Sequence, residues 1–212
     1  MEKDTGTNSF LIRISFFGIC IFVLLYIIAA FLYPGGSQAD KSTKAFSWLN
    51  NYWCDLLSEQ AKNGQNNTAR PIAIISWLIL CASLSVFWYF LPQLFSLKAT
   101  GKKIIQICGI AAMLIAAFLF TRLHDMVIHA GGVLGFIAFI GTFTGFYKNK
   151  MYGLFLTGLF CIALMGLNYY IMVADDLISY LPIVQKITFV IVLLWILFIN
   201  RKLYLQMTKP SP

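Results

Sequence analysis

The chain has 212 residues, of which 59% are hydrophobic and 11% are charged. Soluble domains carry about 25% charged residues, and a soluble protein of this size has too little interior to hide so many apolar side chains. The composition excludes an ordinary soluble domain and predicts an all-α integral membrane protein. The net charge of +8 does not indicate nucleic-acid binding, because Lys and Arg lie in short clusters between apolar runs, where they orient spans in a membrane.

Six apolar runs are long enough to cross a bilayer core, which takes about 20 helical residues. They predict one transmembrane domain over residues 1–212, a bundle of six helices at about 10–33, 71–90, 104–120, 126–147, 151–173 and 183–199. Pro71 suits the first turn of the second helix, and Pro92 suits its end. We expect a multi-pass protein of the cell membrane, in the bacterial inner membrane, with the lipid bilayer as its surroundings.

A polar stretch, residues 34–70, follows the first predicted span. Within it, residues 46–57 are aromatic and amphipathic, with Phe46, Leu49, Trp53, Leu56 and Leu57 at helical spacing. Trp and Tyr favour the headgroup level of a membrane, so these residues predict a short interfacial helix in the first outer loop. Asp55 is a candidate site residue on this helix.

The third and fourth runs meet at a polar corner, residues 121–125. Read as one helix, residues 104–147 would be about 66 Å long, roughly twice a bilayer core, so the chain is expected to reverse at this corner. Both histidines of the chain, His124 and His129, lie at or beside it, together with Arg122 and Asp125. Charged groups near a membrane cost free energy, so we expect this cluster to have a structural or functional role.

Asp125 and His129 are candidate catalytic residues, with Asp55 as a third. If a helix begins near Asp125, the two side chains share a face, and an Asp beside a His orients the ring and raises its basicity, as in a general base. The alternative is that Asp125 caps the helix while His129 hydrogen-bonds a backbone carbonyl.

A zinc site is a second possibility at the corner. His124 and His129 with a carboxylate from Asp55, Asp175 or Asp176 would supply suitable nitrogen and oxygen ligands. However, a spacing of five residues separates the histidines by about 140° on a continuous helix. Both would bind one ion only if the helix starts between them.

Arg122, His124, Asp175 and Asp176 are candidate residues for binding a lipid or another substrate. A guanidinium at the interface suits a phosphate or a lipid headgroup. Alternatively, Arg122 snorkels or pairs with Asp125.

The fourth and fifth runs also carry signals of helix packing. Small residues recur at steps of four and three in the fourth run, at Gly131, Gly135, Ala138, Thr142 and Gly145. Such a ridge lets membrane helices approach closely. Asn168 in the fifth run predicts an interhelical hydrogen bond.

The distribution of basic residues predicts the orientation. Six spans place both termini on one side, and that side receives ten of the 16 Lys and Arg residues. The positive-inside rule therefore puts both termini in the cytoplasm. The first loop, the corner and the Asp175–Asp176 turn then all face outward, and they hold both histidines and most of the acidic residues.

The first loop resembles that of a known family. Asn51-Tyr-Trp-Cys-Asp-Leu-Leu57, then Asn63-Gly and Asn67-Thr-Ala-Arg-Pro-Ile-Ala73, are similar to the first outer loop of a bacterial multi-pass membrane family of unknown function. More distantly, the chain resembles the DRAM-like and GPI-anchor-remodelling six-span proteins, whose Asp-bearing motif and His-Gly-Phe pattern match Asp55, His129, Gly132 and Phe136. Leu57 replaces the glycine usual after Asp-Leu. The resemblance implies an integral membrane protein with an outward polar site that touches lipids.

Three functions follow from these observations. The first is a non-enzymatic membrane protein whose outer Asp/His/Arg cluster is structural or binds a lipid headgroup. The second is a membrane hydrolase using His129 and Asp125, with or without a metal, on a lipid-like substrate. The third is a small transporter, which would need polar groups midway through several spans; Asn168 is almost the only such residue.

Overall fold

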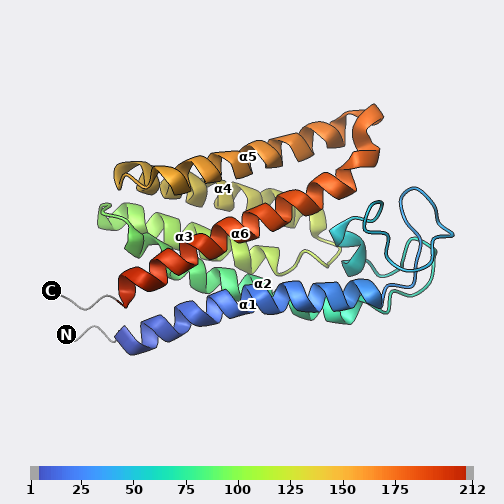
Figure 1. Cartoon of the computed structure of the whole chain (residues 1–212), viewed down its shortest axis with the longest axis horizontal. Coiled ribbons are helices and arrows are strands. Elements are labelled where there is room, and N and C mark those ends of the chain that lie inside the picture. The colour runs from blue at the N-terminus through green and yellow to red at the C-terminus, as the bar shows by residue number, and fades with distance from the viewer. Residues whose placement is uncertain (1–4, 209–212) are drawn as a thin grey trace. The chain divides into compact units, whose positions relative to one another are not determined.

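Six long helices form the body of the computed structural model, which describes residues 5–208 except for the side chains of residues 5–9 and Asp175. They are α1 (Thr5–Phe31), α2 (Arg70–Phe90), α3 (Ala99–Ala116), α4 (His124–Lys148), α5 (Tyr152–Val173) and α6 (Leu181–Met207) (Figure 1). Three short 3-10 helices, η1 (Trp53–Leu57), η2 (Leu91–Leu94) and η3 (Asp175–Tyr180), lie in the connections. The described residues form no strand, only isolated bridges between Gly35 and Lys44 and between Gln60 and Asn66.

All six helices are long and apolar enough to cross a membrane. They also expose large apolar side chains, such as Phe31 in α1 and Phe136 in α4. In water such exposure would be costly, whereas lipid tails solvate apolar side chains as well as the protein interior does. The all-α fold with six potential membrane spans is therefore confirmed.

The observed boundaries differ from the predicted ones by a few residues. The third helix ends at Ala116 rather than near residue 120, and residues 117–123 form the turns of the corner. The sixth helix continues past the predicted end at 199 to Met207. In the first loop, helical structure is limited to Trp53–Leu57, because residues 46–52 form turns and irregular backbone instead of a helix.

The chain divides into two compact units. The first comprises the described residues of Met1–Ile21, Leu78–Thr157 and Trp195–Pro212, and the second comprises Phe22–Trp77 and Gly158–Leu194. Four helices, α1, α2, α5 and α6, contribute residues to both units.

Small residues set the helix packing of the first unit. A Cβ atom added at Gly18 of α1 would lie 1.9 Å from Ser83 Oγ of α2, and one at Gly109 of α3 would lie 2.3 Å from the Trp88 ring. Helices α3 and α4 pack side by side (Figure 1). Part of the predicted ridge is buried: Ala138 and Thr142 are shielded from solvent, and Gly145 leaves room for the ring of Phe95, which precedes α3.

A ladder of hydrogen bonds joins three helices of the same unit. Asn200 of α6 donates to Ser15 Oγ of α1 at 3.1 Å, and Ser15 in turn donates to the backbone carbonyl of Ser83 in α2 at 2.8 Å. All three side chains are buried. Because lipid supplies no competing water, such bonds stabilise the packing of membrane helices.

In the second unit, the predicted interhelical bond of Asn168 is present. Its amide donates to Thr188 Oγ1 of α6 at 2.6 Å and to the carbonyl of Leu164 in its own helix at 2.8 Å. Residues 32–69 form a loop that packs against the other described parts of this unit.

Candidate functional site

The corner belongs to the first unit and is built from a turn followed by the start of α4. Thr121 Oγ1 donates to the carbonyl of Phe118 at 2.7 Å and accepts the N–H of Leu123 at 3.3 Å, which stabilises the reversal between α3 and α4. Arg122, His124 and Asp125 are exposed at its rim.

The two histidines of the corner bind different groups. His129 Nδ1 lies 2.7 Å from the backbone carbonyl of Asp125, whereas His124 Nδ1 lies 3.1 Å from the Asp125 carboxylate. The carboxylate is 95% exposed. Asp125 therefore does not orient the His129 ring through its side chain, and it pairs with His124 rather than with Arg122. A catalytic role for these residues stays a prediction.

The two histidines are not placed to bind the same metal ion. Helix α4 begins at His124, so both histidines lie within it and are separated by about 140° around its axis. Among the described residues, no three His, Cys, Asp or Glu side chains are grouped as metal ligands.

Asp176 is exposed in η3 of the second unit, and the side chain of Asp175 lies outside the described residues. Asp55 belongs to the same unit, and its carboxylate bonds to Lys62, Asn51 and Tyr52 of the first loop. The expectation that Asp55 and these residues meet the corner histidines stays a prediction.

Asp55 is the centre of a buried polar network in the first loop. Its side chain is only 4% exposed and forms an ion pair with Lys62 at 3.4 Å. Its other oxygen accepts the Asn51 amide at 3.0 Å and the Tyr52 backbone N–H at 2.9 Å. A buried carboxylate is costly unless such donors surround it, so this arrangement locks the loop around Asp55.

Two buried asparagines extend the network. Asn51 also donates to the carbonyl of Gly36 at 3.0 Å. Asn67 donates to the carbonyls of Asp55, Leu56 and Ser58 at 2.9–3.1 Å. It thereby supplies hydrogen bonds to the carbonyl groups at the end of η1. Gly36 adopts a φ of +80°, and a Cβ there would lie 2.2 Å from the backbone nitrogen of Asn63. Only glycine fits this close approach.

Lys186 connects the loop to α6. Its ammonium donates to the carbonyl of Asn51, 135 residues away in the chain, and to the carbonyl of Pro182 at 2.9 Å. It also lies 5.6 Å from the centre of the Phe46 ring and 6.0 Å from that of Trp53, within the range of cation–π attraction.

Aromatic side chains surround this lysine. Phe46, Trp48 and Trp53 contact one another with ring centres 5.3–6.4 Å apart. Tyr26 of α1 donates to the Trp53 carbonyl at 2.9 Å, and Gln185 of α6 accepts the Trp53 backbone N–H at 3.2 Å. We call Phe46, Trp48, Trp53 and Lys186 the aromatic–lysine cluster.

Two donors in this cluster have hydrogen-bonding capacity that the described residues do not use. The indole N–H of Trp53 is buried and has no hydrogen-bond partner among the described residues. The Lys186 ammonium carries three N–H groups, and two of them reach carbonyls. A ligand with acceptor oxygens could satisfy these donors, which makes this cluster the candidate binding site of the second unit.

Sequence reasoning missed Lys186, Asn51 and Asn67. Asn51 and Asn67 lie in the stretch that resembles a known family, and this resemblance could have identified them as site residues. No local pattern distinguishes Lys186 from other lysines near a span end. No protein-family model, no curated protein and no solved structure matches the chain.

Proposed function

We propose that this chain is a non-enzymatic multi-pass membrane protein that binds an anionic lipid headgroup at the aromatic–lysine cluster. The observation that carries the proposal is the buried indole N–H of Trp53, which has no partner among the described residues, in the same cluster as a Lys186 ammonium that uses two of its three N–H groups. A phosphate or ester oxygen of a lipid accepts hydrogen bonds from both kinds of donor.

The surroundings of the cluster favour a lipid over a soluble ligand. Trp48 of the cluster is exposed, and the neighbouring Leu49 is 61% exposed. Lys41 and Lys44 are exposed in the same loop. Aromatic side chains next to lysines are typical of protein surfaces that meet lipid headgroups.

Lipid selectivity tests the proposal. Binding of dioleoylphosphatidylglycerol and dioleoylphosphatidylcholine to the purified protein is measured by native mass spectrometry. We expect Lys186→Gln to weaken binding of the anionic lipid about fivefold, the loss of about 1 kcal/mol that one basic group contributes near a membrane surface. Lys186→Arg, which keeps the charge, should retain binding.

Lys148→Gln is the matched control, because it removes one exposed lysine at the C-terminal end of α4. Equal affinity of the wild type for both lipids, or an equal loss in Lys186→Gln and Lys148→Gln, would overturn the proposal.

We also propose that both termini face the cytoplasm, which follows from the positive-inside rule. Cys54 provides the test, because desolvation by burial and the Asp55 carboxylate raise its pKa to about 11, although part of the residue is exposed. The thiol is therefore protonated at neutral pH, and its thiolate fraction rises about tenfold for each pH unit below that pKa.

In right-side-out membrane vesicles, we expect a membrane-impermeant maleimide to label Cys54 from outside. Labelling should be slow at pH 7 and about tenfold faster at pH 8. Cys54→Ser identifies the labelled site. Labelling only after the vesicles are permeabilised would contradict the orientation, and a rate that does not change with pH would contradict the raised pKa.

The geometry favours neither of the other two functions. A hydrolase that uses Asp125 to orient His129 would need a contact between their side chains, whereas the His129 ring binds a backbone carbonyl. A transporter would use Asn168 as a pathway residue, whereas its amide nitrogen is engaged in joining two helices.

A further inference from the structure

A pocket of about 350 Å³ lies in the first unit between α1 and α6. It is lined by Ile12, Arg13, Phe16, Phe17, Asn200, Arg201 and Tyr204. Its residues come from the beginning of the α1 span, Phe10–Phe31, and from the last turns of the α6 span, Asp176–Met207. The pocket shares no residue with the aromatic–lysine cluster, so its role is independent of the function proposed above.

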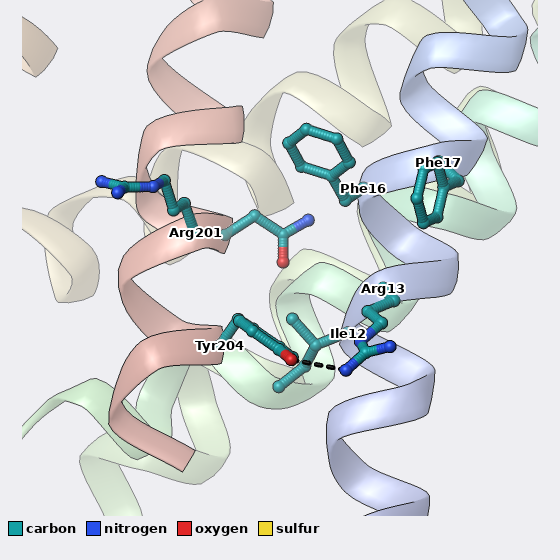
Figure 2. A pocket seen from close by; sticks show the side chains of 7 residues that line it. Ile12, Arg13, Phe16, Phe17, Arg201 and Tyr204 are labelled. Atoms are coloured by element: carbon teal, nitrogen blue, oxygen red, sulfur yellow. Dashed lines mark hydrogen bonds between the residues drawn. The ribbon is translucent and has the colours of Figure 1, made fainter. Parts of the chain in front are cut away.

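The two sides of the pocket differ in chemistry. Ile12, Phe16 and Phe17 supply an apolar wall, and Figure 2 shows Phe16 facing the space between the two helices. Arg13 and Tyr204 meet from opposite helices, with Arg13 Nη2 donating to the Tyr204 hydroxyl at 2.5 Å (Figure 2). Such an amphipathic lining suits a ligand with an apolar chain and a charged head.

Among the described residues, no carboxylate neutralises the cations of the pocket. The ion pairs of the described side chains involve neither Arg13 nor Arg201. Arg13 stacks over the Tyr204 ring at 5.0 Å, which holds the guanidinium in place while leaving N–H groups for another acceptor. The Tyr204 hydroxyl accepts a hydrogen bond from Arg13, so its own proton is available to donate.

An unsatisfied acceptor also lines the pocket. Asn200 is 1% exposed, and its side-chain oxygen has no hydrogen-bond partner among the described residues. Its amide nitrogen is held by Ser15, which fixes the direction of the oxygen. A buried carbonyl oxygen without a donor costs free energy, so a ligand that carries an O–H or N–H group would relieve this cost.

We propose that this pocket binds one anionic phospholipid whose headgroup carries a hydroxyl, such as phosphatidylglycerol. Arg13 and the Tyr204 hydroxyl donate to the phosphate, a headgroup hydroxyl donates to the Asn200 oxygen, and an acyl chain lies along Phe16 and Ile12. Arg201 points away from Arg13 and Tyr204 in Figure 2, so it adds positive charge near the headgroup without donating to the phosphate alongside them.

Native mass spectrometry with dioleoylphosphatidylglycerol tests this assignment. The measurements use the Lys186→Gln background, so that binding at the aromatic–lysine cluster is weakened equally in every protein compared. We expect Arg13→Gln and Tyr204→Phe each to weaken binding about fivefold or more, because each removes a charge-assisted hydrogen bond to the phosphate. Tyr204→Phe keeps the ring that lines the pocket, and its thermal unfolding temperature should match that of the parent.

Lys202→Gln is the control, because it removes the same charge from the residue next to Arg201, which is exposed and does not line the pocket. It should leave binding within a factor of two. Dioleoylphosphatidylcholine should bind more weakly than phosphatidylglycerol, and millimolar inorganic phosphate should not displace the lipid.

Three outcomes would overturn the assignment. They are unchanged binding in a folded Tyr204→Phe variant, an equal loss in Lys202→Gln, and full displacement of the lipid by inorganic phosphate, which would reveal a site for the free anion. Because every variant is compared with the same Lys186→Gln parent, the differences between them report on this pocket and not on the aromatic–lysine cluster.

Discussion

Replacing Asp55 with alanine is expected to lower the free energy of unfolding by about 1–3 kcal/mol for each buried donor that loses its acceptor, because Lys62 is 37% exposed and can be solvated by water when the ion pair is lost. The carboxylate is 4% exposed and binds Lys62, Asn51 and the Tyr52 N–H. Without it, the buried Asn51 amide loses one acceptor and the Tyr52 N–H loses its partner. The loop of residues 32–69 then lacks the carboxylate that its buried polar network is built around.

Thermal unfolding in detergent and limited trypsin digestion check this expectation. Lys41, Lys44 and Lys62 offer trypsin sites within the loop, and the loop of the variant should be cut much faster than that of the wild type. Asp40→Ala is the control, because Asp40 is exposed and bonds only locally, to Ser42. A variant loop as resistant as the wild-type loop would show that the buried network is not what holds the loop together.

The second large effect concerns a matched pair of glycines in α4. At Gly145, an added Cβ would lie 2.6 Å from the ring of the buried Phe95, whereas at Gly135 it would meet no atom within 4 Å. We expect Gly145→Ala to destabilise the protein by about 1–3 kcal/mol through overpacking. Gly135→Ala should be neutral or stabilise it by up to about 1 kcal/mol, because alanine restricts the unfolded chain.

Thermal unfolding of both variants in one detergent gives the comparison. The sign of the difference matters more than its size, since the two substitutions are chemically identical. If Gly145→Ala is as stable as Gly135→Ala, then α4 does not pack against Phe95 as closely as the structure has it.

The membrane helices were predictable because their signal is local. Length and hydropathy alone located all six, and the polar residues 121–125 correctly placed the reversal between α3 and α4. The bond from Asn168 was also predictable, since an amide inside an apolar run needs a partner from a neighbouring helix. The prediction that the small-residue ridge packs closely was correct at Gly145 but not at Gly135. Small residues permit a close approach, but they do not show at which positions another helix makes it.

The candidate sites were predictable only in part, because their contacts span large distances in the chain. Lys186 and Asn51 are 135 residues apart, and Arg13 and Tyr204 are 191 apart. Asp55 was recognised as important, but it was expected on the face of a surface helix. Its burial depends on Asn51, Lys62 and Asn67 wrapping around a five-residue 3-10 helix, and helical periodicity does not describe such a loop.

The bond between Lys186 and Asn51 also sets an order of events during biogenesis. The loop is synthesised early, but one of its anchors belongs to the last helix, 135 residues later. At translation rates of about 5–20 residues per second, the loop waits roughly 7–27 s for this partner. A nascent chain that stops before the sixth helix therefore carries its aromatic loop without that anchor.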